Sequence, residues 1–255
     1  MRAVILGSGG AAGVPAIASG WGLCDPTNPK NRRLRPSILV ETEATRILVD
    51  TSPDLREQLL TQNVQALDAI LYTHAHADHL HGIDDIREVN RAMGREIPIW
   101  GTKDVLADIN QRFSYVFEPL APGSKSIYKP LLAPNEIKGP FQVGDIAVTP
   151  LVQDHGYLDT IGFRFGNLAY TTDLVSLPEE SFAALEGIEI WIIGCLTNVF
   201  DHPTHVSVDM AVQWINRIKP RRAVISHMGG RLDYATLKGS LPDHIEPAYD
   251  GMVII

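Results

Sequence analysis

Short apolar runs rich in valine and isoleucine recur along the chain, and no other feature limits its possible folds as strongly. Runs of this kind are typical of buried strands. We expect strands at residues 3–6, 37–41, 46–50, 69–73, 97–100, 146–150, 190–194 and 223–226. Two pairs of segments are close enough in sequence to form hairpins, 37–41 with 46–50 and 162–166 with 168–172.

Helical segments are expected between many of these strands. The pattern predicts helices at 54–62, 84–93, 103–113, 178–185 and 207–218, and several begin at a Ser, Thr or Asp that can cap the first turn. Strands mixed with helices and hairpins are typical of an α+β fold, in which helices cover the sheets. The proline-rich segment 114–140 shows no clear period, so we expect a long loop there.

Size and composition are those of an ordinary globular protein. The chain has 255 residues and no internal repeat or low-complexity linker, so we expect a single domain over residues 1–255. Its two cysteines, Cys24 and Cys195, are too few for a disulfide framework and fit a reducing compartment. Two glycines and Pro15 interrupt the first apolar run, which favours a strand over a signal peptide. We expect a cytoplasmic protein with no membrane segment, because no apolar run approaches the ~18–20 residues that span a bilayer.

The formal net charge of −8 disfavours nucleic acid as a partner, because the surface as a whole repels a phosphate backbone. A short basic run is the exception, formed by Lys30, Arg32, Arg33 and Arg35. Most of this run is expected to be solvated. Arg35 lies nearest to a strand, and it is the residue of the four that we would choose for a contact with a substrate phosphate.

The stretch LYTHAHADHLHG holds four histidines within eight residues and follows directly after an expected strand. In an extended chain, side chains two residues apart point to the same side, so His74 and His76 can meet one ion. Asp78 and His79 follow as the chain turns towards a helix, where they can face a second ion. Imidazole and carboxylate are standard ligands of zinc and manganese, so the stretch predicts a metal site.

More ligands are needed, because this cluster alone cannot complete two metal sites. Three candidates each come directly after a strand-like segment, namely His155, Asp173 and His227. Taken singly, an aspartate at such a place is more often a turn residue or a helix cap, and a histidine is more often simply hydrogen-bonded. Together with the cluster, they indicate that the polar ends of several strands meet at one edge of the sheets.

This order of residues resembles the metallo-β-lactamase-fold hydrolases, whose pattern is His-x-His-x-Asp-His followed by single His, Asp and His ligands. The resemblance implies a four-layer αββα sandwich with the metals in loops at one edge. It also implies two ion sites and a bridge: His74, His76 and His155 for one ion, Asp78, His79 and His227 for the other, and Asp173 between them.

Within this superfamily the chain resembles the phosphodiesterase branch that includes PhnP, a phosphoribosyl cyclic phosphodiesterase. The likeness is carried by ILGSGGAAGVP (5–15), RRLRPS (32–37) and THVSVDMAV (204–212). It implies that His205 assists catalysis, by hydrogen bonding to a phosphate oxygen or by protonating the leaving oxygen. PhnP also carries a cysteine cluster and a late histidine for a structural zinc. Here only Cys24 and Gly230 stand in those places, so we expect no structural zinc.

Two adjacent divalent ions suit phosphodiester hydrolysis, because they make hydroxide available at neutral pH and offset the charge of the phosphate. Asp78 would also orient that hydroxide. We therefore expect a dinuclear zinc or manganese hydrolase that acts on a small cyclic or nucleotide-like phosphate ester. A homodimer is implied by the resemblance alone. Two alternatives stay open, a tRNA 3′-end endonuclease of the same superfamily and a non-hydrolytic metal-binding accessory protein of the same fold.

The residues that remain carry weaker interpretations. The glycine-rich loop 7–12 fits a loose dinucleotide-binding pattern, but Pro15 disfavours the helix that should follow it. A loop that lets the backbone approach the metals is the favoured interpretation. His81 and His202 are candidates for orienting the ligands, and His244 is expected at the surface.

Overall fold

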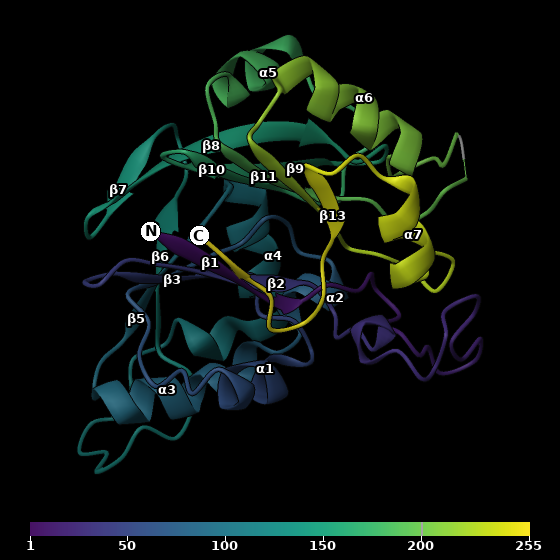
Figure 1. Ribbon diagram of the computed structural model, residues 1–255. Helices are drawn as coiled ribbons and strands as arrows, with labels where there is room; N and C mark the ends of the chain where they lie inside the picture. The colour runs from purple at the N-terminus through teal and green to yellow at the C-terminus, as the bar shows by residue number, and fades with distance from the viewer. Residues whose placement is uncertain (200) are drawn as a thin grey trace.

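Two seven-stranded sheets lie face to face with helices on both outer sides (Figure 1). The structure is a computed structural model, and it describes residues 1–199 and 201–255. In this view α5 (Glu179–Leu185) and α6 (Val208–Ile218) cover the upper sheet, while α1 (Leu55–Thr61) and α3 (Ile86–Met93) lie beneath the lower one. This four-layer αββα sandwich is the α+β fold that the sequence predicts.

The first sheet has the order β14-β1-β2-β3-β4-β5-β6. Neighbouring strands are antiparallel from β14 through β1 and β2 to β3. They are parallel from β3 to β6. The strands are β1 (Arg2–Gly7), β2 (Ser37–Glu41), β3 (Arg46–Val49), β4 (Ala69–Leu71), β5 (Ile97–Gly101), β6 (Leu132–Glu136) and β14 (Val253–Ile254).

The second sheet has the order β13-β12-β11-β10-β9-β8-β7. Strands β7 to β10 are antiparallel, and β10 to β13 are parallel. They are β7 (Phe141–Val143), β8 (Ile146–Asp154), β9 (Asp159–Phe165), β10 (Leu168–Thr171), β11 (Ile190–Gly194), β12 (Arg222–Ser226) and β13 (Ile245–Pro247). The remaining helices are α2 (Ala77–Leu80), α4 (Lys103–Phe113), α7 (Tyr234–Ser240) and the 3-10 turns η1 (Pro29–Asn31), η2 (Ile83–Asp85) and η3 (Ser114–Val116).

Inner strands are buried on both faces, which explains why they are continuous apolar runs and not alternating ones. In β1, Ala3 and Ile5 belong to the core between the two sheets, whereas Val4 and Leu6 belong to the core between the first sheet and the α1 and α3 helices. Successive side chains of a strand point to opposite faces, so one strand supplies both cores. Among the described residues, no helix combines the length and the apolarity needed to cross a bilayer.

Each strand and helix that the sequence predicts has a counterpart, and both hairpins are present as β2–β3 and β9–β10. The expectation of a long loop over 114–140 is wrong in part, because the segment contains η3 and the whole of β6. β6 lies at the edge of its sheet and buries only Leu132 of its five residues. An edge strand tolerates proline and needs little apolar surface. β6 therefore lacks the apolar run of an inner strand, and its Pro134 made the segment resemble a loop.

Candidate metal centre

The strand ends that the sequence singles out meet at one edge of the sandwich. His74, His155, Asp173 and His227 follow β4, β8, β10 and β12, and these four strands belong to both sheets. The short helix α2, which carries Asp78 and His79, lies at the same end, to the right in Figure 1. Loops from both sheets therefore build one centre.

Three histidines form the first group of the centre. His74, His76 and His155 each offer a ring nitrogen, and these nitrogens lie within 4.8 Å of one another. The His74 and His76 rings have centroids 4.5 Å apart, as their spacing of two residues predicts. His74 is buried, whereas His76 is exposed, so this group borders solvent.

The second group is fully buried and contains both carboxylates. It consists of Asp78, His79, Asp173 and His227. Nε2 of His79 lies 3.3 Å from Oδ2 of Asp78 and 3.0 Å from Oδ2 of Asp173. Nε2 of His227 lies 3.2 Å from the same Asp173 oxygen. Ligand atoms around a tetrahedral zinc are spaced similarly, at roughly 3.4 Å for bonds of ~2.1 Å.

The Asp173 carboxylate faces both groups. Its Oδ2 points to His79 and His227, while its Oδ1 lies 3.8 Å from Nε2 of His155 and 3.9 Å from Nδ1 of His205. Its backbone has φ of 52°, in the left-handed region that aspartate and asparagine tolerate better than most residues. The arrangement is that of a carboxylate able to bridge two cations.

Several buried ring nitrogens of the centre make no hydrogen bond. They show whether the residues present fit a metal ion. Among the described residues, Nε2 of His74, Nε2 of His79 and both ring nitrogens of His227 are buried without a hydrogen bond. Orphaned buried polar atoms are rare and costly in folded proteins. Since all of these residues also point into clusters of ligand type, the donor set fits divalent cations.

The carboxylates of the centre are held in their ionised form. Burial alone would raise the pKa of Asp78, but the adjacent imidazoles of His79 and His227 outweigh it and hold that pKa well below its usual range. The pKa of Asp173 is lowered in the same way, since the charges of His227 and His79 outweigh its burial. Burial lowers the pKa of His74, so this ring is neutral, as a ligand must be.

The sequence analysis missed the residues that hydrogen-bond to the ligand candidates from behind, above all Asp50 and Thr73. Asp50, fully buried at the end of β3, accepts a hydrogen bond from Nδ1 of His79 at 2.6 Å. It also accepts one from the hydroxyl of Thr73, which lies 3.0 Å from Nδ1 of His74. On the other side, Nδ1 of His155 donates to the carbonyl of Thr204 at 2.8 Å. These contacts leave Nε2 of each ring free to bind an ion.

His205 lies at the centre, as the sequence predicts, and its side chain is only 12% exposed. Its ring centroid is 5.0 Å from that of His155 and 5.2 Å from that of His227. Burial lowers the pKa of His205 to about 3, so the ring is neutral at pH 7 and carries a single N–H donor. With His155 and Asp173 it also forms a third group of ligand type.

The glycine-rich loop approaches the centre closely, and no helix follows it before η1. A Cβ on Gly10 would lie 2.6 Å from Leu196 and 3.4 Å from the His227 ring. Asp250 holds the start of the loop, because its carboxylate accepts from the amide and hydroxyl of Ser8, at 2.8 and 2.7 Å. A side chain at Gly10 would therefore displace the end of the Leu196 side chain, which lies beside the centre.

The basic run has a different role from the one considered for it. Arg35 binds both carboxylate oxygens of Asp54, and its pKa is raised by Asp54 and also by the charge of Asp78 in the centre. Arg33 is 2% exposed and donates to the carbonyls of Gly229 and Leu232, at 3.2 and 2.6 Å, which fixes the segment after His227. Cys24 stands beside the Arg33 guanidinium, with Sγ 3.9 Å from Nη1.

The other histidines make no hydrogen bond to a ligand candidate among the described residues. The ring of His202 lies beside His205, with centroids 5.2 Å apart. His81 packs against Phe113, and its Nε2 lies 3.5 Å from a guanidinium nitrogen of Arg112. His244 is exposed.

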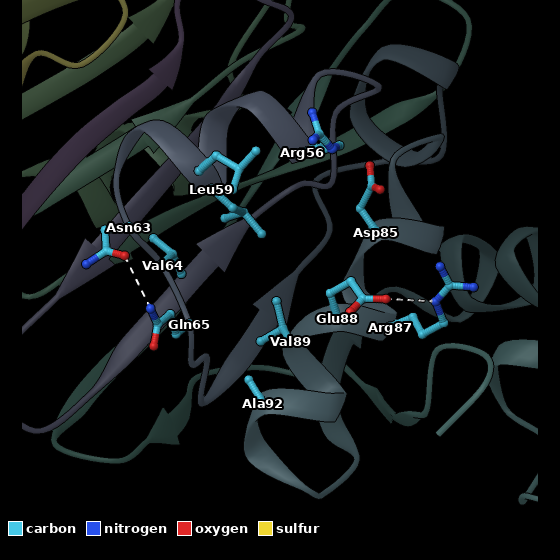
Figure 2. Close-up of a pocket in the computed structure, with 11 residues that line it drawn as sticks. Arg56, Leu59, Asn63, Val64, Gln65, Asp85, Arg87, Glu88, Val89 and Ala92 are labelled. Atoms are coloured by element: carbon cyan, nitrogen blue, oxygen red, sulfur yellow. Dashed lines mark hydrogen bonds and ion pairs between the residues drawn. The ribbon is translucent and has the colours of Figure 1, made fainter. Parts of the chain in front are cut away.

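The centre opens into a cavity of about 260 Å³, which is also lined by the exposed side chains of Tyr157 and Leu158. A larger cavity of about 750 Å³ shares His76 and Leu158 with it. A third pocket, of about 420 Å³, lies between α1 and α3 and is lined by Leu59, Val89 and charged side chains (Figure 2). Among the residues that the structure describes, it shares none with the lining of the metal cavity, and none of those that line it is a histidine.

Two facing sheets with a histidine–carboxylate centre at one edge define the architecture of the metallo-β-lactamase-fold hydrolases. The chain belongs to this superfamily, since residues 45–228 match the family described as the beta-lactamase superfamily domain. The match covers the ligand candidates of both groups.

Among solved structures, the chain is similar to a protein described as a new diphosphatase from the PhnP family, with a TM-score of 0.91 and 30% identity over 100% of this chain and 97% of that one. Zinc-bound PqqB from Methylobacterium extorquens has the same fold, with a TM-score of 0.76 and 18% identity over the full length of both chains. The likeness to the PhnP branch that the sequence suggests is thereby confirmed.

A curated relative from Porphyromonas gingivalis (strain ATCC BAA-308 / W83) is named octanoyltransferase. It is 35% identical over 263 residues, which cover 100% of this chain and 51% of the relative. The chain thus spans about half the length of the curated relatives it matches.

Proposed function

We propose that the chain is a phosphodiesterase that uses two divalent cations, zinc or manganese, to hydrolyse a small phosphate ester. The observation that carries the proposal is Asp173, whose two oxygens face two separate histidine groups. The 30% identity to a PhnP-family diphosphatase over nearly the whole of both chains supports phosphate chemistry.

The ligand groups determine where the cations would sit. His74, His76 and His155 would hold one, and the buried group of Asp78, His79 and His227 would hold the other, with Asp173 shared. Cations bound there would lower the pKa of a water between them and offset the charge of a phosphate. Asp78 is ionised and can accept a hydrogen bond, so it would orient that water.

His205 would act on the substrate directly. It lines the same cavity as the ligands, and its neutral ring has one N–H to offer. From this place it can donate a hydrogen bond to a phosphate oxygen, or to the leaving oxygen as the P–O bond breaks. Full proton transfer to the leaving oxygen would need the imidazolium form of the ring.

Turnover of bis(p-nitrophenyl) phosphate by purified protein, reloaded with zinc or manganese, tests the proposal. We expect turnover that requires the ion, and its loss in His205→Ala with both ions retained by elemental analysis. His244→Ala is the matched control, because His244 is an exposed histidine outside the cavity. Stoichiometric ions without turnover would favour an accessory role, and an absence of bound ions would refute the centre itself.

A further inference from the structure

A separate cavity of about 300 Å³ adjoins the metal cavity, and we call it the Arg231 cavity. It is lined by Leu196, His202, Gly229 and Arg231, among others. Leu196 lines the metal cavity as well, so the two spaces are neighbours on either side of one side chain. The Arg231 cavity lies between the segments that follow β11 and β12.

The polar groups of this cavity favour an anion. Arg231 is exposed and offers a guanidinium with several N–H donors. The amide of Thr204 donates to Nδ1 of His202 at 3.4 Å, so a neutral His202 ring carries its proton on Nε2 and can donate it. None of the described residues that line the cavity carries a carboxylate.

The large cavity on the opposite side has the contrary charge. Beside His74 and His76 it is lined by three carboxylates and one guanidinium, those of Asp104, Asp108, Asp159 and Arg112. A second anionic group of a substrate would be repelled there and attracted to the Arg231 cavity. The two sides of the metal cavity therefore differ in the charge that they accept.

We infer that the Arg231 cavity binds a second phosphate of the substrate, linked to the phosphate that the metal centre binds. The inference rests on the proposed function and makes the substrate class an ester of diphosphate. Arg231 binds two oxygens of the second phosphate through its planar fork, and Nε2 of His202 donates to a third.

The spacing of the histidines agrees with two consecutive phosphates. The His202 ring is 5.2 Å from the His205 ring, which is itself 5.2 Å from that of the ligand candidate His227. His205 thus neighbours both His202 and a ligand candidate of the metal centre. A group in contact with His202 is adjacent to the reacting phosphate and not remote from it.

The test compares two ligands that differ by one phosphonate group, phenyl methylphosphonate and monophenyl methylenediphosphonate. Their dissociation constants are measured by isothermal titration calorimetry with metal-loaded protein, and their inhibition constants against bis(p-nitrophenyl) phosphate. We expect the unsubstituted chain to bind the diphosphonate at least tenfold more tightly, and Arg231→Gln to reduce that preference about tenfold. A tenfold change corresponds to about 1.4 kcal/mol. Arg231→Lys keeps the charge and should retain part of the preference.

Arg221→Gln is the matched control, since Arg221 is an exposed arginine just before β12, whereas Arg231 lies beyond the other end of that strand. It should leave the preference unchanged. The inference is overturned if the unsubstituted chain shows no preference, if Arg231→Gln retains it, or if Arg221→Gln loses it equally. The calorimetric comparison does not depend on turnover, so failure of the proposed hydrolysis would be recognised separately.

Discussion

Asp50 accepts a hydrogen bond from Nδ1 of His79 across 2.6 Å, and both side chains are completely buried. The same carboxylate oxygen accepts the hydroxyl proton of Thr73 at 2.8 Å, so the Thr73 oxygen is left to accept from Nδ1 of His74 at 3.0 Å. His79 belongs to one ligand group and His74 to the other. A single carboxylate behind the centre therefore orients one ring of each group.

The first prediction concerns this carboxylate. Asp50→Asn keeps the size of the side chain but replaces one carboxylate oxygen with an amide NH2 group. The amide side chain then has one acceptor oxygen and cannot accept all the hydrogen bonds that His79 and Thr73 donate to the carboxylate. We expect the affinity for both ions to fall, each by roughly 10- to 100-fold, as is usual when an outer-sphere partner of a ligand is lost. Competition with a chromophoric chelator measures this. Asp243→Asn changes an exposed aspartate and should have no effect. Unaltered affinity for both ions in Asp50→Asn would show that Asp50 does not orient the rings.

The second prediction concerns the bridge. Asp173→Asn keeps a residue type that tolerates the local φ of 52° but removes the negative charge between the two groups. We expect the chain to retain at most one ion per molecule after gel filtration, with a larger loss of affinity than Asp50→Asn shows. Elemental analysis measures the ratio. Retention of two ions with unchanged affinity would exclude the bridging role.

The third prediction tests how the His205 segment is positioned. Gly156 has φ of +86°, and a Cβ there would lie 2.4 Å from the carbonyl oxygen of Pro203. Gly156→Ala must push 203–205 away from the centre, which separates Thr204 from His155 and moves His205. We expect turnover to fall at least tenfold, and the strained backbone to cost about 1–3 kcal/mol of stability.

Gly187→Ala provides the control for strain alone. Gly187 has φ of +73°, but a Cβ there would meet no atom within 4 Å. Gly187→Ala should lower the free energy of unfolding by about as much as backbone strain does in Gly156→Ala. It should leave turnover unchanged. Equal turnover in the two variants would mean that the contact between Gly156 and Pro203 does not position the site.

The fold could be predicted because its strands are buried on both faces. Double burial makes β2 and β11 continuous apolar runs, and such runs are visible without an alignment. β6 lacks this signal, since it lies at an edge and fully buries only one of its five residues. An edge strand does not need apolar residues on both faces, and this explains why β6 was not predicted. Its local structure is not unusual.

The ligand candidates could be predicted because strand ends collect at one edge, and Asp173 stood out as a polar residue directly after an apolar strand. Asp50 follows β3 in the same way, so the same rule would have selected it. Asp50 was not selected because an aspartate directly after a strand is usually a turn residue, and this ordinary role accounts for it. Arg33 could not be assigned from sequence, since its burial depends on carbonyls that lie about two hundred residues further along the chain.

The fourth prediction concerns pH and the carboxylate that anchors the glycine-rich loop. Burial raises the pKa of Asp250 to about 6, although amides of Ser8 and Leu34 donate to it. The folded chain therefore holds this proton more tightly than the unfolded chain, whose aspartate has a pKa near 3.9. The resulting stability is fully present below about pH 4 and is lost as the pH rises through about 6.

Asp250→Asn cannot titrate, so the difference in free energy of unfolding between the two chains isolates this effect. We expect the unsubstituted chain to lose about 1 kcal/mol relative to Asp250→Asn between pH 5 and pH 7, from linkage of the cited shift. Metal binding is common to both chains and cancels in the comparison. Urea unfolding at several pH values measures the difference, and the exposed Asp243→Asn serves as the control. A difference that stays constant with pH, or that changes in the opposite direction, would show that Asp250 is not held protonated by its burial.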